Sequence, residues 1–511
     1  MGLPNTSNKK ICFLLQRRYA HIGQALAELL SQKYDVQKFC GYVFTRESYD
    51  YLKNQNSLHF TQLLFDEDIH RRYQTESIDW EFIKRLEIEY GLPNLWPYIE
   101  LDRIIRSNQL VRAYPYDTPR YSHEEMIKIL QVKAKAIIKF MDEEKPDAVI
   151  FSAIGAIGSL LLYSIAKKRN VKILHIRPTC VNTKCTLSGH YGYFSYIDDL
   201  FIKLQTGKIS LPEHETSVKS FLEKFRQKPE PYCSLDLPKF RPINRRRQFS
   251  FLNPKKFLWS IYWWPKKIIR YLADPYRDDY SNINPLWEIW DNFKKKIRVL
   301  IGFESFYDEI DAKENFIFFP LHLEPEIATL LYAPFYKDQL WLIKQIARSL
   351  PLDFKLYVKE HPAMVGFRSR RFYRELKKIP NVKLVRPTIE SLPLINTAKL
   401  IVTISGTAGW EAIQLKKPVI VFGDVFYEQL PMVKKCVAIE QLPYLVKEQL
   451  ENFKHDETAL LNFLKAIYQE SVDVNFVQIW NIENASQIAT KKNQLLPLVD
   501  LIAEKLNLTI N

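Results

Sequence analysis

Residues 399–423 read KLIVTISGTAGWEAIQLKKPVIVFG and contain a strand, a turn, a helix and a second strand in succession. The apolar runs at 400–404 and 419–422 are short and rich in Ile and Val, which is typical of parallel strands buried on both faces. Between them, residues 408–415 have the composition of a helix. A strand, a helix and a strand in this order predict a parallel sheet and an α/β fold.

The same alternation recurs in two parts of the chain. In the first 205 residues it is seen at 9–41 and again at 145–178, and after residue 300 it runs from 314 to 423. We therefore predict two Rossmann-like domains facing one cleft. The expected boundaries are an N-terminal domain at 1–205, a linker or insertion at 206–300, and a second domain with C-terminal helices at 301–511.

Composition narrows the class of protein. A chain of 511 residues with 47% hydrophobic residues can fill more than one core, so disorder is not expected. The six cysteines are scattered, with no CxxC pair, which indicates reduced thiols in the cytoplasm and neither disulfides nor a zinc site. The first apolar run, residues 11–15, is too short for the core of a signal peptide.

Residues 239–277 form a basic aromatic segment. They contain eleven Lys or Arg, one acid and ten aromatic residues, whereas the whole chain has a formal net charge of +15. Aromatic rings with positive charges favour the surface of an anionic membrane, and a solvated insertion that packs on a neighbouring domain is the main alternative. Nucleic acid is disfavoured because no nucleic-acid fold signature accompanies the segment. We expect a cytoplasmic protein that associates peripherally with the inner face of the membrane.

Polar residues follow three of the strands expected after residue 300. Ligands of open α/β sheets bind beyond the carboxyl ends of the strands, so these residues predict a binding site. At the third strand end, Gly406 would let the backbone approach an anion while the N–H groups of the following helix point toward it. Ordinary helix capping at this turn and a structural role for the histidines are the alternatives. The residues concerned are His322, Glu324 and Glu326, then Lys359, Glu360, His361 and Pro362, then Ser405, Gly406 and Thr407.

The motif KEHP at 359–362 and the motif SGTAGWEAI at 405–413 carry a family resemblance. Residues 316–436 resemble the capsule polysaccharide biosynthesis group of bacterial glycosyltransferases, which is related to the β-Kdo transferases and, more distantly, to bacterial sialyltransferases. The resemblance implies the GT-B arrangement of two Rossmann-like domains. It also implies that His361-Pro362, with Ser405 and Thr407, contacts the nucleotide phosphate of an activated sugar.

Sugar transfer needs a base for the acceptor hydroxyl and fixed donors for the departing phosphate. Glu326 and, after the first strand of the chain, His21 are the candidate catalytic residues, although both could be structural. Donor binding is assigned to His322 and to residues 359–362 and 405–407, and Glu411 would bind a ribose or cap the turn. No cofactor or metal is expected, because no Asp-x-Asp motif lies at a strand end.

The expected function is transfer of a sugar from a nucleotide donor, with a CMP-sugar such as CMP-Kdo favoured, to a saccharide or lipid-linked saccharide acceptor of capsule or lipopolysaccharide. Three alternatives stay open at this point. They are a glycerol- or ribitol-phosphate polymer transferase, a nucleotide-sugar epimerase, and a non-catalytic assembly or export protein.

Overall fold

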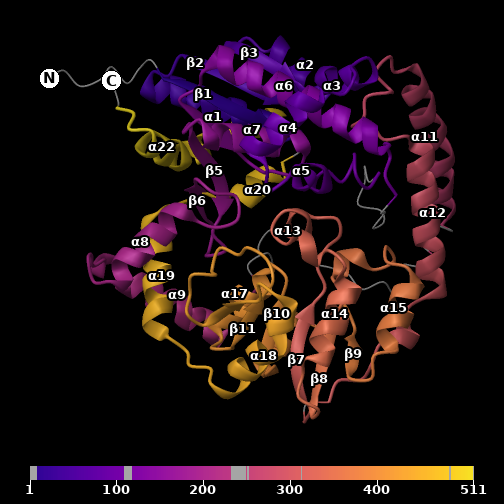
Figure 1. The fold of residues 1–511 in the computed structure, drawn as a ribbon, viewed down its shortest axis with the longest axis vertical. Helices are drawn as coiled ribbons and strands as arrows, with labels where there is room; N and C mark the ends of the chain where they lie inside the picture. Colours follow the sequence, from indigo (N-terminus) through magenta and orange to yellow (C-terminus); the bar gives the residue numbers. More distant parts are fainter. Residues whose placement is uncertain are drawn as a thin grey trace. The chain divides into compact units, whose positions relative to one another are not determined.

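The computed structural model describes residues 9–108, 118–231, 249, 253–311, 313–482 and 485–509. The chain divides into two compact units (Figure 1). The first unit comprises Met1–Asp102, Tyr121–Ser220 and Thr458–Asn511, and the second comprises Arg103–Arg120 and Phe221–Glu457. Each unit is built on its own sheet, which confirms the predicted α/β class with two Rossmann-like domains. That the two domains face one cleft stays a prediction.

The sheet of the first unit has the order β13-β6-β5-β4-β1-β2-β3. The five strands from β3 to β5 are parallel, whereas β6 pairs antiparallel with β5 and β13 pairs antiparallel with β6. Strand order therefore reverses between β1 and β4, as in a doubly wound sheet. The strands are β1 (Lys10–Leu15), β2 (Lys38–Val43), β3 (Phe60–Phe65), β4 (Ala148–Phe151), β5 (Lys172–Pro178), β6 (Lys184–Ser188) and β13 (Ser471–Asp473).

Helices cover both faces of this sheet because successive strand residues point to opposite faces. Ile11, Phe13 and Leu15 of β1 share one core with α1 (Tyr19–Tyr34) and α22 (Leu496–Lys505). Tyr42 of β2 points the other way, toward α6 (His123–Glu144) and α7 (Ile157–Lys168). The central strands are thus buried on both sides.

The last part of the chain returns to the first unit. Strand β13 extends its sheet, and α22 packs against α1 in its core. The sequence predicts these residues in the second domain, at 301–511, because they follow it directly along the chain. The structure places them in the first unit, where β13 pairs with β6 and α22 covers the apolar face of α1.

The second unit has a six-stranded parallel sheet of order β12-β11-β10-β7-β8-β9, which reverses between β7 and β10. Helices α14 (Gln339–Arg348), α15 (Arg370–Lys377) and α18 (Leu442–Glu451) supply the core of one face. Helix α17 (Thr407–Gln414) packs on β10 and β11 with buried side chains outside that core, so it covers the other face. The strands are β7 (Asn315–Pro320), β8 (Phe354–Lys359), β9 (Val382–Val385), β10 (Leu400–Thr403), β11 (Val419–Val421) and β12 (Val433–Lys435).

The predicted insertion at 206–300 is largely helical where it is described. After α9 (Glu215–Gln227), the helices α11 (Pro254–Ala273) and α12 (Pro285–Ile301) contact each other and form a hairpin (Figure 1). Of the basic aromatic segment 239–277, residues 239–248 and 250–252 lie outside the described residues. No helix in the described ranges is both long and apolar enough to cross a bilayer.

A buried ion pair in the first unit gives a stability prediction. Nζ of Lys133 on α6 lies 2.6 Å from both carboxylate oxygens of Asp66, and both side chains are at most 1% exposed. Lys133→Met should leave a buried carboxylate without its cation and lower the free energy of unfolding by about 3–5 kcal/mol.

The measurement is urea-induced unfolding of the full chain, with Lys139→Met as the matched control on the same helix. Lys139 is 75% exposed and 3.7 Å from Glu143, so its loss should cost less than about 1 kcal/mol. Equal effects of the two substitutions would contradict the prediction.

Candidate functional site

The predicted site residues of the second unit gather at the carboxyl edge of its sheet. His322 follows β7, Lys359 ends β8 and is followed by Glu360–Pro362, and Ser405–Thr407 join β10 to α17. Because β10, β7 and β8 are neighbours in the sheet, their ends lie together at the point where strand order reverses. This is where open α/β sheets bind their ligands.

His322 is buried and joins two of these strand ends. Its Nε2 accepts the amide N–H of Ser405 at 3.3 Å and lies 3.4 Å from Oγ1 of Thr403. Burial, reinforced by the charge of Arg368, lowers the pKa of His322 to about 3. The ring is therefore neutral at physiological pH, and its acceptor nitrogen is committed to the turn between β10 and α17.

Gly406 fits this turn because it has no side chain. A Cβ there would lie 2.8 Å from Oγ1 of Thr403 and 3.1 Å from Nε2 of His322. The amide of Gly406 donates to Thr403 at 3.1 Å, and the hydroxyl of Ser405 donates to the carbonyl of Ala328 at 2.9 Å. Ser405 thus shapes the turn with both its amide and its hydroxyl.

The start of α17 leaves backbone donors available. No side chain caps the helix, and within the described ranges the amides of Thr407 and Ala408 donate to no acceptor. The side chain of Thr407 is exposed. Two amide N–H groups and one hydroxyl at a helix N-terminus form a suitable site for an anion.

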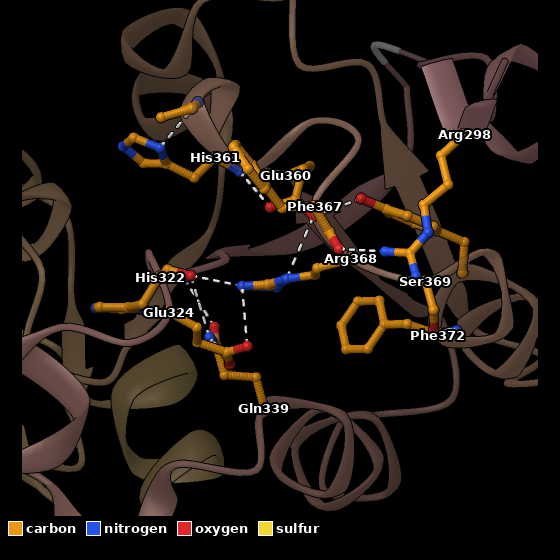
Figure 2. A network of polar contacts seen from close by, with 12 residues as sticks. Arg298, His322, Glu324, Gln339, Glu360, His361, Phe367, Arg368, Ser369 and Phe372 are labelled. Atoms are coloured by element: carbon orange, nitrogen blue, oxygen red, sulfur yellow. Dashed lines mark hydrogen bonds and ion pairs between the residues drawn. The ribbon is translucent and has the colours of Figure 1, made fainter. Parts of the chain in front are cut away.

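At the end of β8, a buried carboxylate orients an exposed histidine (Figure 2). Glu360 is fully buried; its Oε1 accepts the amide of His361 at 2.7 Å, and its Oε2 accepts the hydroxyl of Tyr373 at 2.7 Å. His361 is exposed, and its Nδ1 accepts the amide of Ala363 at 3.2 Å. Pro362 begins the short 3₁₀ helix that makes this contact possible. Glu360 supports the strand end, whereas His361 can reach a ligand.

Lys359 and Glu411 are a pair of buried ionisable groups. Burial lowers the pKa of Lys359 to about 8, and its Nζ donates to Oγ of Ser391 at 3.1 Å. Burial also raises the pKa of Glu411 to about 7, against a smaller opposing effect of the charge of Lys359. Glu411 therefore changes charge near neutral pH.

The two candidate bases lie in different units. Glu326 is the N-cap residue of α13 (Ile327–Leu330) and is half-buried, and its backbone carbonyl accepts the amides of Thr329 and Leu330. His21 lies in the first turn of α1, where its ring contacts Tyr51 edge to face and burial lowers its pKa. Neither assignment is tested by these contacts, and both stay predictions.

Sequence reasoning missed several residues that hold the site. Gln339 of α14 accepts the amide of His322 at 2.7 Å and donates to its carbonyl at 3.1 Å. Tyr427 donates to the carbonyl of Gly406 at 2.6 Å, and Arg368 donates to the carbonyl of His322. A polar residue inside an otherwise apolar helix face, as at Gln339, is a usable signal. The tyrosine and the arginine carry no comparable signal, because both types are common on surfaces.

The geometry suits a phosphate better than a metal ion. Exposed His361, the hydroxyl of Thr407 and the amides of α17 are hydrogen-bond donors, which bind oxyanions. Within the described residues, no group of three His, Cys, Asp or Glu side chains could hold a metal. Metal-independent chemistry stays a prediction.

Comparison with known families finds a match within the second unit. Residues 300–435 match the family described as capsule polysaccharide biosynthesis protein. This confirms the resemblance predicted for 316–436. A curated relative is Protein FixF of Sinorhizobium fredii, which is 30% identical over 128 residues. That match covers 24% of this chain and 29% of FixF.

Among solved structures, the β-Kdo 2,4 transferase of Thermosulfurimonas dismutans KpsC is similar with a TM-score of 0.37 and 14% identity, over 66% of this chain and 84% of that one. The β-Kdo 2,7 transferase of the same KpsC has a TM-score of 0.35 and 12% identity, over 71% and 89%. MnaA of S. aureus, solved with UDP, has a TM-score of 0.26 and 13% identity, over 98% of each chain.

The raised pKa of Glu411 predicts how stability depends on pH. In the unfolded chain a glutamate ionises near pH 4.3, whereas in the folded protein the pKa of Glu411 is about 7. The folded state therefore holds the proton more tightly between these values, and folding stability falls as the pH rises through them. Between pH 5 and pH 8 the free energy of unfolding of the wild type should fall by about 2–3 kcal/mol relative to that of Glu411→Gln.

Urea unfolding of both proteins at the two pH values measures this difference. The control is Glu451→Gln at an exposed position on α18. The free energy of unfolding of this variant should differ from that of the wild type by the same amount at both pH values. A difference for Glu411→Gln that is the same at pH 5 and pH 8 would show that Glu411 ionises normally.

Proposed function

We propose that this protein is a glycosyltransferase of capsule polysaccharide biosynthesis that transfers a sugar from a nucleotide-activated donor to a saccharide or lipid-linked saccharide acceptor. The observation that carries the proposal is that exposed His361 and the uncapped start of α17 follow β8 and β10, which flank β7 in the second sheet. We assign the nucleotide phosphate to these donors. That site lies inside the region that matches the capsule family. A CMP-sugar such as CMP-Kdo is the favoured donor.

The roles of the residues follow from the charge that develops during transfer. As the sugar departs, negative charge grows on the nucleotide phosphate and needs donors that are already in place. His361, Thr407 and the amides at the start of α17 would supply them, and the helix dipole adds to the effect. Glu411, when protonated, can donate a hydrogen bond without repelling the phosphate.

The acceptor hydroxyl must lose a proton as it attacks the sugar. Glu326 is the proposed base on the second unit, and His21 is the alternative on the first. No metal or other cofactor takes part in this proposal. Because the charge of the leaving group would be met by the protein alone, turnover should persist in a chelator.

The experiment is to incubate the protein with CMP-, UDP- and GDP-sugars and to follow nucleotide release with and without capsule or lipopolysaccharide acceptors. Acceptor-dependent release supports the proposal. Conversion of the donor sugar without an acceptor would instead identify an epimerase, and transfer of a glycerol- or ribitol-phosphate unit would identify a polymer transferase. No turnover with any donor would favour an assembly or export protein.

In the same assay, His361→Ala should reduce turnover by about 10²-fold or more, as for loss of one oxyanion contact, because the phosphate loses a donor. Thr407→Ala should weaken nucleotide binding by about 1–3 kcal/mol if its partner is left buried. Exposed His59→Ala in the first unit is the matched control. Wild-type turnover in folded His361→Ala would remove this histidine from the site.

We also propose that the protein works at the inner face of the membrane, as a peripheral cytoplasmic enzyme. The hairpin α11–α12 exposes apolar side chains on both helices, and α11 carries five Lys or Arg and no acid. A large exposed apolar area beside positive charge fits the surface of an anionic bilayer. The side chains, each at least 36% exposed, are Leu258, Trp259, Ile261, Tyr262, Ile269 and Leu272, with Leu286, Trp287, Trp290, Phe293, Ile297, Leu300 and Ile301.

Sedimentation with vesicles tests the membrane surface. The protein should bind phosphatidylglycerol vesicles far better than phosphatidylcholine vesicles, and 1 M salt should release much of it, since the Debye length falls from about 10 Å at 0.1 M to about 3 Å. Lys266→Glu with Arg270→Glu should weaken the charge-dependent part by about 1 kcal/mol per charge removed. Trp259→Ala with Trp287→Ala should weaken the part of the vesicle binding that remains in 1 M salt. Binding indifferent to lipid charge, salt and all four substitutions would make the hairpin a purely structural insertion.

A further inference from the structure

Arg368 lies at the centre of the contacts beneath the candidate site (Figure 2). Its side chain is 1% exposed, and its Nη2 donates to the carbonyl of His322 at 2.6 Å. The same nitrogen lies 3.6 Å from Glu324, and Nε lies 3.5 Å from Glu360. One guanidinium thus touches the residues that follow β7 and the residue that follows β8.

These partners are the ones that orient the site. Glu360 holds the amide of His361, and His322 holds the amide of Ser405. Gln339 closes the arrangement, because it bonds both backbone groups of His322 and also the carboxylate of Glu324. Arg368 is therefore connected to the exposed His361 through Glu360, and to the turn before α17 through His322.

Stability alone does not account for this burial. A buried arginine with carboxylates is commonly no more stabilising than apolar residues of the same volume, because desolvation offsets the attraction. Burial raises the pKa of Glu324, which shows the same desolvation acting on one partner. A planar guanidinium with several donors does fix the geometry of several acceptors at once, as a single lysine ammonium cannot.

Arg368 is in turn held from outside by helix α12. The loop 366–368 rests on that helix: Arg298 donates to the carbonyl of Phe367 at 2.6 Å, and Nζ of Lys295 lies 3.5 Å from the centre of the Phe367 ring. Gly366 has φ +85°, and a Cβ on it would lie 2.7 Å from Val299. Phe372 lies against the guanidinium on the α15 side, with its ring centre 5.0 Å away.

We propose that Arg368 is a positioning residue of the donor site. Its guanidinium fixes the position of His361 relative to the turn at 405–407, and helix α12 fixes the position of Arg368 through Arg298. The inference rests on the proposed function for its ligand, a nucleotide phosphate. Its structural part concerns the free protein and is tested without any ligand.

The first measurement is amide hydrogen exchange of the free full-length chain, in peptides that cover 360–364 and 404–408. Arg368→Met should speed exchange in both by about tenfold or more, because their amides bond to groups that Arg368 holds. Arg368→Lys keeps the charge but not the fork of donors, so it should restore only part of the protection. Exposed Arg371→Met on α15 is the matched control and should leave exchange unchanged.

Unchanged exchange in both peptides would overturn the proposal. Equal acceleration throughout the second sheet would also overturn it, since that pattern belongs to a residue that only stabilises the unit. If Arg368→Met fails to fold, Arg368→Lys and Arg298→Met are measured in its place. Faster exchange confined to the two peptides would support the proposal, and unchanged exchange or equal acceleration throughout the second sheet would overturn it.

A double-mutant cycle tests the link to α12. Arg298→Met should speed exchange in the two peptides by less than Arg368→Met, and the double variant should resemble Arg368→Met alone, because both changes act through one guanidinium. Strictly additive effects would remove α12 from the proposal.

The second measurement is binding of CMP and UDP by calorimetry. Arg368→Met should weaken the nucleotide that the wild type binds by about tenfold or more, the size expected for loss of a charge-assisted hydrogen bond. Local acceleration of exchange with unchanged nucleotide affinity would overturn the positioning role. A wild type that binds no nucleotide would remove the proposed function, whereas the exchange data would still decide whether Arg368 orders the two strand ends.

Discussion

The hydrogen bond from the amide of Ser405 to the ring of His322 joins positions 83 residues apart in the chain and closes the reversal point of the second sheet. It requires an imidazole that is neutral, and burial supplies this by lowering the pKa of the ring. It also requires a residue without a side chain at 406. Once these conditions hold, the turn that leads into α17 is fixed, and the first amides of that helix donate to no acceptor within the described residues. A protonated His322 would lose the acceptor nitrogen on which the turn depends.

The polar side chains at this edge of the sheet fall into two groups, those that support the backbone and those that are exposed to a ligand. Glu360 and His322 are buried, and each accepts a backbone amide of the site, so they determine where those backbone groups lie. His361 and Thr407 are exposed, and they are the ones that a ligand can touch. Adjacent residues such as Glu360 and His361 therefore differ in role, because the side chain of Glu360 is buried beside Tyr373 and Arg368 whereas that of His361 is exposed.

The sequence contained enough information for the α/β class, both sheets and the positions of the three polar strand ends, because hydrophobic runs and short turns are local patterns. It could not show which polar residues are buried, since Glu360 and Glu326 look alike in a sequence. Tyr427 was missed because its hydroxyl bonds a backbone carbonyl, which residue identity does not reveal. Arg368 was missed because its contacts with His322, Glu324 and Glu360 depend on how the loop after β8 folds back beneath β7. Strand β13 was missed for another reason: it is three residues long and pairs with a strand nearly 290 positions earlier.

The path of the chain through the first unit has a consequence for synthesis. Residues 221–457 are inserted between α8 (Ser195–Gln205) and the segment that carries β13 and α22. At the two crossings, Arg226 makes a double ion pair with Glu457 at 2.6 and 2.8 Å. On a ribosome, the second unit is complete before the first has received its edge strand and the helix that covers α1. The nascent first unit must therefore wait, with an unpaired edge at β6 and an uncovered apolar face, until β13 and α22 emerge. Synthesis of the second unit thus precedes completion of the first, although the first unit begins earlier in the chain.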